Sequence, residues 1–106
     1  MSHFDPDSVF AALADPTRRA VLTRLLNGGP TSASALAPDF DVSRQAVVKH
    51  LGVLQEAGLV KPERVGREVR YEVQTEPLAD AAEWLARTGA AWDRRLARLA
   101  RHVSRR

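Results

Sequence analysis

The chain has 106 residues, the size of one compact domain, and its 16 basic and 13 acidic side chains give a formal net charge of +3. It has no cysteine, which excludes disulfides and thiolate metal ligands. No apolar run approaches the ~20 residues of a membrane span, and the first residues lack the pattern of a signal peptide, so we expect a cytoplasmic protein without a membrane partner.

Two short helices are predicted before residue 30. The first is expected to begin at Ser8, because apolar side chains follow it at near-helical spacing, namely Val9, Phe10 and Leu13. The second is expected to begin with Asp15 as its N-cap and Pro16 as its first residue. The sequence Asn27-Gly28-Gly29 should end it, since glycine favours helix C-termini.

Two further helices are predicted between Pro30 and Gly58. Thr31 is expected to cap a short helix over residues 32–37, and Ser43 to cap a longer one that Gly58 ends. In the longer helix, positions i, i+4 and i+7 are apolar and should face the core together: Val47, Leu51 and Leu54. A short helix, a turn and a longer helix with a polar start are typical of a helix-turn-helix.

A β-hairpin is predicted next, because the apolar period changes from 3.6 to 2. Residues 69–73 alternate between apolar and charged side chains, and residues 60–65 should form the partner strand. Gly66-Arg67 is a two-residue turn, and Pro62 indicates that the first strand lies at an edge. The predicted fold is therefore mainly α with a small β-hairpin, a winged helix-turn-helix.

The last predicted element is a long helix that opens near Pro77 and runs to Val103, about 40 Å at ~1.5 Å per residue. Residues spaced by sevens and fours form an apolar seam over four heptads: Leu78, Ala82, Leu85, Gly89, Trp92, Leu96, Leu99 and Val103. Since one small domain cannot cover this length, a second copy is the expected partner. We divide the single domain 1–106 into a winged-helix core, 8–75, a dimerisation helix, 76–103, and a tail, 104–106.

The polar face of the helix that starts after Ser43 is the candidate DNA-reading surface. Arg44 and Gln45 match guanine and adenine edges, Val48 can touch a thymine methyl, and Lys49 supplies charge for a phosphate. Arginines surround the hairpin tip, with Arg67 favoured as the groove or backbone contact. The full expected DNA-binding set is Ser43, Arg44, Gln45, Val48, Lys49, His50, Arg64, Arg67 and Arg70. The alternatives are a solvated amphipathic helix and a hairpin whose charges only keep an edge soluble.

Four segments in this order resemble the ArsR/SmtB family of bacterial winged-helix repressors: Asp15-Pro16-Thr17-Arg18-Arg19, residues 43–51, residues 54–60 and Gly66-Arg67. The likeness covers about residues 8 to 100. It implies a homodimeric, often autoregulatory repressor that grips an inverted-repeat operator and acts by occlusion, with its first and last helices at the dimer interface. The interface residues expected from this and from the seam are Phe10, Leu78, Leu85, Gly89, Trp92, Leu96 and Leu99.

Departures from the family pattern concern the inducer. Metal sensors of this family often carry Cys-x-Cys before the recognition helix, where this chain reads Ser34-Ala35-Leu36-Ala37. The last helix also lacks the paired His and carboxylate pattern of a second known metal site, although it contains Asp80, Glu83, Asp93 and His102. We therefore expect the non-metal branch, with no cofactor, no metal and an unidentified inducer. A metal site between two chains stays open as an alternative.

No motif for catalysis is present. The sequence has no Gly-rich phosphate loop, no Ser-His-Asp arrangement and no His-x-x-x-His. An enzyme is therefore not expected. A winged helix can also serve as a protein-interaction module without specific DNA binding, which is the alternative function class.

Overall fold

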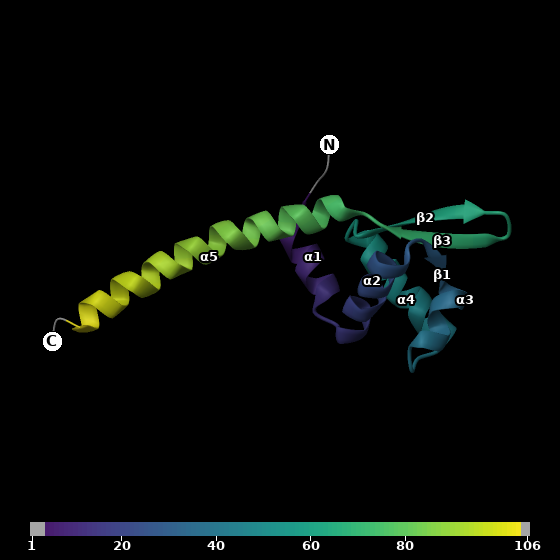
Figure 1. Ribbon diagram of the computed structural model, residues 1–106, viewed down its shortest axis with the longest axis horizontal. Coiled ribbons are helices and arrows are strands. Elements are labelled where there is room, and N and C mark those ends of the chain that lie inside the picture. Colours follow the sequence, from purple (N-terminus) through teal and green to yellow (C-terminus); the bar gives the residue numbers. More distant parts are fainter. Residues whose placement is uncertain (1–3, 105–106) are drawn as a thin grey trace.

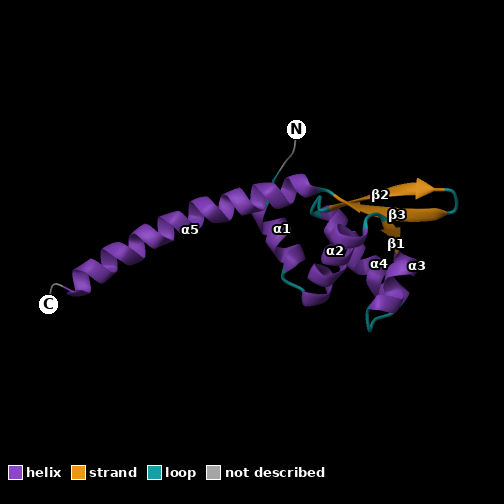
Figure 2. Ribbon diagram, in the orientation of Figure 1, coloured by secondary structure: helices purple, strands orange, loops and turns teal. Residues whose placement is uncertain are grey.

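A computed structural model describes residues 4–104, except for the side chains at positions 92, 93, 95, 96, 99, 100 and 102–104. Within this range the chain forms helices and a small antiparallel sheet (Figures 1 and 2). The bounds are α1 Pro6–Leu13, α2 Pro16–Gly28, β1 Thr31–Ser32, α3 Ala33–Leu36, the 3-10 helix η1 Ala37–Asp39, α4 Arg44–Glu56, β2 Val60–Val65, β3 Glu68–Val73 and α5 Thr75–Ser104. None of the helices described is long and apolar enough to cross a bilayer. The predicted winged helix-turn-helix is confirmed.

The predicted start of α1 at Ser8 is wrong by two residues. The helix begins at Pro6 with Asp5 as its N-cap, because the Asp5 carboxylate accepts the backbone N–H of Asp7 at 3.1 Å. The Ser8 hydroxyl instead donates to the same carboxylate at 2.7 Å. Asp-Pro thus opens both α1 and α2, since proline suits the first helical turn and aspartate caps the free N–H groups.

The predicted N-cap of the short helix after Pro30, α3, is also wrong. Ser32, rather than Thr31, caps α3, and its hydroxyl accepts the backbone N–H of Ala35 at 3.2 Å. Thr31 and Ser32 form the short strand β1, which pairs with Tyr71 and Arg70 of β3. The sheet therefore has three strands where the sequence predicted two, because the free edge of β3 captures the segment that leads into α3.

The sheet has the strand order β1-β3-β2, which places β2 and its Pro62 at an edge as predicted. Glu63 lies opposite Arg70, and Arg64 lies opposite Val69. Gly66 has a φ of 64°, the left-handed conformation that a two-residue hairpin turn requires. The hairpin of β2 and β3, called the wing below, projects on the side of the molecule opposite the C-terminus (Figure 1).

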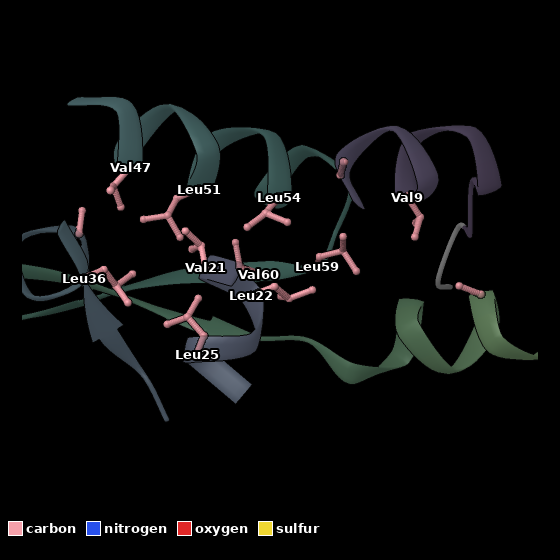
Figure 3. Packing of buried hydrophobic residues seen from close by; sticks show 13 residues of the cluster. Val9, Val21, Leu22, Leu25, Leu36, Val47, Leu51, Leu54, Leu59 and Val60 are labelled. Carbon is pink, nitrogen blue, oxygen red and sulfur yellow. The ribbon is translucent and has the colours of Figure 1, made fainter. Parts of the chain in front are cut away.

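The core forms where α4 lies over α2 and α3. Val47, Leu51 and Leu54 are fully buried, as predicted, and point toward α2 side chains such as Leu22 and Leu25 (Figure 3). Ser43 caps α4 as predicted, with its hydroxyl accepting the backbone N–H of Ala46 at 3.1 Å. The buried stripe fixes the rotation of α4 about its axis, so the opposite stripe of the helix must face solvent.

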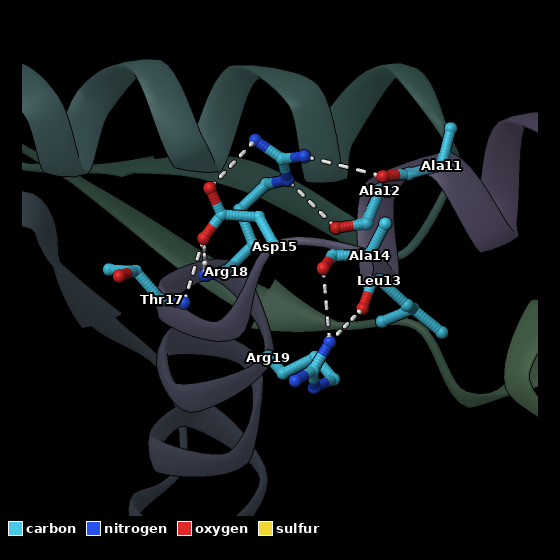
Figure 4. Close-up of polar contacts among 8 residues, drawn as sticks. All are labelled: Ala11, Ala12, Leu13, Ala14, Asp15, Thr17, Arg18 and Arg19. Atoms are coloured by element: carbon cyan, nitrogen blue, oxygen red, sulfur yellow. Dashed lines mark hydrogen bonds and ion pairs between the residues drawn. The ribbon is translucent and has the colours of Figure 1, made fainter.

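Two arginines fasten the end of α1 to the start of α2 (Figure 4). Arg18 donates to the carbonyl oxygens of Ala12 and Ala11, at 2.8 and 3.3 Å, and Arg19 donates to those of Leu13 and Ala14. These carbonyls lie at the end of a helix, where backbone acceptors lack the usual intrahelical donors, so the guanidinium groups supply donors. The Ala11 carbonyl also accepts the backbone N–H of Ala14 at 3.3 Å. The Asp15 carboxylate caps α2 and lies 3.8 Å from the Arg18 guanidinium.

The long helix α5 joins the core only through its first part. Ala81 is buried, Leu78 packs against the core, and the Trp84 ring lies 5.4 Å from the Phe10 ring of α1. Beyond this point α5 extends away from α2, α3, α4 and the wing (Figure 1). It begins at Thr75, two residues before the predicted opening, and gives the chain a longest dimension of 68 Å.

Asp15 makes the stability of the fold sensitive to acid. The backbone N–H of Arg18, then that of Thr17 and the Arg18 charge, hold the pKa of the Asp15 carboxyl below its ordinary value of 3.8. A carboxyl with a lowered folded-state pKa stabilises the fold fully above its unfolded-state pKa, and this stabilisation is lost as the pH falls through and below 3.8. Asp15→Asn keeps a capping oxygen without the charge. We expect Asp15→Asn to lose less unfolding free energy than the wild type when the pH is lowered from neutral to acidic, as measured by urea titrations.

The matched control is Asp41→Asn, which removes a charge from the exposed loop before α4. It should leave the acid sensitivity of the wild type in place. An Asp15→Asn variant that loses stability with acid as steeply as the wild type would contradict this role of the cap.

Candidate nucleic-acid interface

The exposed stripe of α4 carries the residues predicted to read a nucleic acid. Gln45 and Lys49 are one helical turn apart, and both are exposed on the side opposite the buried stripe. Val48 is 40% exposed beside them. The structure therefore presents an amide, a cation and an apolar group on one helical face, as the sequence predicted. The DNA contacts of these residues stay predictions.

Arg44 is held apart from this stripe. Its Nε donates to the hydroxyl of Ser34 in α3 at 2.8 Å, so the guanidinium is fastened between the two helices of the helix-turn-helix. Arg44 and Val48 line an open cavity of about 310 Å³ between α3, α4 and the wing. The wing side of this cavity contains Arg67, Glu68, Val69 and Tyr71, and the α3 side contains Ser32, Ala33 and Ser34.

The three wing arginines do not share one surface. Side chains alternate between the two faces of a strand pair, and Arg64 lies on the face of Val69 and Tyr71, whereas Arg70 lies on the other face opposite Glu63. Arg70 also donates from Nε to the Glu68 carboxylate at 3.2 Å. Arg67 occupies the turn and lines the cavity beside α4. The structure thus places Arg67 and Arg44 on the same cavity and pairs Arg70 with Glu68.

His50 lies on a different side of α4 from Gln45 and Lys49. It is half-buried. Its predicted contact with DNA is not tested.

Ser34 is the site residue that the sequence did not indicate. The α3 segment drew attention only because cysteine is absent from it, and no local periodicity predicts a hydrogen bond across ten residues to Arg44. No signal in the sequence indicates this contact, because it depends on how α3 and α4 pack against each other.

The predicted dimer residues fall into two groups. Phe10 and Leu78 pack within their own chain, whereas Leu85 is 52% exposed and nothing lies within 4 Å of the position that a Cβ on Gly89 would take. Trp92, Leu96 and Leu99 have side chains outside the described part of the structure. Together with the exposed Ala82, Leu85 and Gly89 form the uncovered part of the seam that the structure describes.

Among the side chains described, no group of three or more His, Asp or Glu residues lies close enough to hold a metal ion. Asp93 and His102, two of the four α5 residues considered from the sequence, lie outside those side chains. Asp80 is half-buried beside Phe4 and Glu76, and Glu83 forms an ion pair with Arg87 at 2.6 Å.

Comparisons with known proteins agree with this geometry. The family model of a helix-turn-helix domain matches residues 13–63, which include α2, α3 and α4. A solved ArsR-like transcriptional regulator from Rhodococcus is 50% identical, superposes with a TM-score of 0.78, and covers 91% of this chain and 90% of its own.

Two curated relatives extend the comparison. The transcriptional repressor SdpR of Bacillus subtilis is 35% identical over 79 residues, which are 74% of this chain and 87% of that protein. The HTH-type transcriptional regulator Rv2034 of Mycobacterium tuberculosis is 45% identical over 74 residues, 70% of this chain and 68% of that protein. Both matches span most of each protein.

Proposed function

Since the chain belongs to the ArsR family of winged helix-turn-helix transcriptional regulators, we propose that it is a homodimeric repressor that occupies an inverted-repeat operator and occludes a promoter. The family consists of DNA-binding regulators and not of enzymes. The observation that carries the proposal is the exposed Gln45 and Lys49 stripe, opposite the fully buried side of α4 and beside the wing.

The chemistry of this stripe suits a major groove. The Gln45 amide can donate to and accept from an adenine edge, and Val48 offers an apolar contact for a thymine methyl. Lys49 adds a positive charge one turn further along the helix, where the duplex backbone borders the groove. Together these groups support recognition of a sequence as well as of a charge.

The shape of α5 supports the homodimer. This helix has 30 residues, and Leu85 is 52% exposed where α5 leaves the core. A second copy that packs along the seam would bury this side chain and close a two-fold assembly. Two recognition helices related in this way predict half-sites about one helical turn apart, or a multiple of it.

Gln45 and Lys49 should affect DNA binding in different ways. In Gln45→Ala, the preference at one base position should weaken by about 1 to 3 kcal/mol, because a bidentate base contact is lost. In Lys49→Ala, affinity should fall on every duplex, because a phosphate contact is lost. The slope of log affinity against log salt concentration should also become shallower by about one unit. Fluorescence anisotropy on an operator selected from random duplexes, over a series of salt concentrations, measures both effects.

Gln55→Ala is the matched control, since Gln55 is exposed near the other end of α4 and should change neither quantity. Equal affinity of the wild type for the selected operator and a scrambled duplex would contradict sequence-specific binding. It would favour the alternative of a protein-interaction module.

The dimer is tested by Leu85→Glu. Because Leu85 is half exposed within one chain, the substitution should leave the fold intact and put a charge into the seam, which is costly to bury without a partner. We expect sedimentation equilibrium to show a large shift toward monomer. Ala90→Glu adds the same charge at an exposed position off the seam and should keep the dimer. An unchanged dimer for Leu85→Glu would contradict the seam.

A further inference from the structure

The cavity beside α4 combines fixed positive charge with a defined position in the helix-turn-helix. The Arg44 guanidinium is oriented by the Ser34 hydroxyl at 2.8 Å, and Arg67 reaches the same cavity from the turn of the wing. Since Ser34 accepts from Nε, the two terminal nitrogens of Arg44 keep their donors for another partner. Two arginines that line one open cavity are suited to an oxyanion.

The acidic side chain at this cavity does not cancel that charge. Glu68 is among the lining residues, and its carboxylate accepts from Arg70 at 3.2 Å. Arg70 therefore balances Glu68, which leaves Arg44 and Arg67 as the net charge at the cavity. The expected DNA contact of Arg70 itself stays a prediction.

The position of Ser34 indicates which part of DNA would meet these arginines. In a helix-turn-helix the second helix enters the major groove while the first crosses the sugar-phosphate backbone. In this chain α3 is the first of the two helices, and Arg44 is fastened to it. The guanidinium is thus held toward α3 and, with it, toward the path of the backbone.

We propose that Arg44 and Arg67 clamp one phosphodiester of the DNA backbone between the recognition helix and the wing, and that Ser34 is the positioning residue of this clamp. The inference rests on the proposed DNA binding, but it requires no particular operator. It assigns Arg44 a phosphate where the sequence analysis expected a guanine, and the two roles are separated by the test below. The clamp would fix the orientation of α4 on the duplex without adding sequence information of its own.

The arginine test compares Arg44→Ala, Arg67→Ala and the double variant on a selected operator and on a random duplex. Each single variant should weaken binding to both duplexes by about tenfold, the scale of a hydrogen bond to a charged group. The ratio of the two affinities should stay within about a factor of two of the wild-type ratio. The double variant should flatten the salt dependence by about one unit, because both arginines serve one phosphate.

Arg87→Ala is the charge-matched control. This exposed arginine lies on α5 and pairs with Glu83, so its loss should leave affinity and salt dependence near wild type. Thermal denaturation of all variants should give nearly unchanged midpoints, since Arg44 and Arg67 are exposed. A loss of fold is thereby separated from a loss of contact.

The positioning role of Ser34 is tested by a double-mutant cycle. Ser34→Ala should weaken binding several-fold in the wild type and have no further effect in Arg44→Ala, because the hydroxyl acts only through that guanidinium. Ser34→Thr retains an acceptor hydroxyl and should restore most of the affinity. Additive effects of Ser34→Ala and Arg44→Ala would overturn the positioning role.

Three further outcomes overturn the clamp. A change of preference at one base position in Arg44→Ala would make this residue a base reader. A salt dependence that flattens by about two units in the double variant would place the arginines on separate phosphates. No loss of affinity in either single variant would remove the contact. If the wild type shows no operator preference, the proposed repressor function fails, while the clamp is still measured on the random duplex.

Discussion

The burial of one stripe of α4 constrains the rest of the interface. Val47, Leu51 and Leu54 are fully buried against α2 and α3, and removing such side chains from a core costs several kcal/mol each, about 2 to 5. The helix therefore cannot rotate about its axis without exposing them. Gln45 and Lys49 face solvent because their neighbours face the core, so packing energy sets the direction of the polar groups.

Periodicity in the sequence predicted most of this arrangement. The spacing of apolar residues in α4, the Asp15-Pro16 start of α2 and the Gly66 turn each depend on neighbours within one or two turns of chain, which local physical chemistry describes well. The strand β1 could not be found in this way, because Thr31 is a strand residue only through its pairing with Tyr71. The Arg44–Ser34 bond was missed for the same reason, since it links two helices across a turn.

Net charge was a poor guide to the interface. Residues 87–106 hold seven arginines and one aspartate, yet residues 87–104 belong to the part of α5 that extends away from the wing (Figure 1). Among the residues described, few cations lie near α4. The partner of each one determines whether its charge is available to a ligand. Arg44 is oriented by a neutral hydroxyl and keeps its charge available, whereas Arg70 is occupied by Glu68.

Pro62 protects the outer strand of the wing against aggregation, a property that is separate from recognition. An exposed strand edge is a template on which other chains can add strands and aggregate, and a missing N–H and nearby charges oppose that growth. Strand β2 has both, since Pro62 lies between Lys61 and Glu63. The wing can therefore extend into solvent while its outer edge resists pairing with strands of other chains.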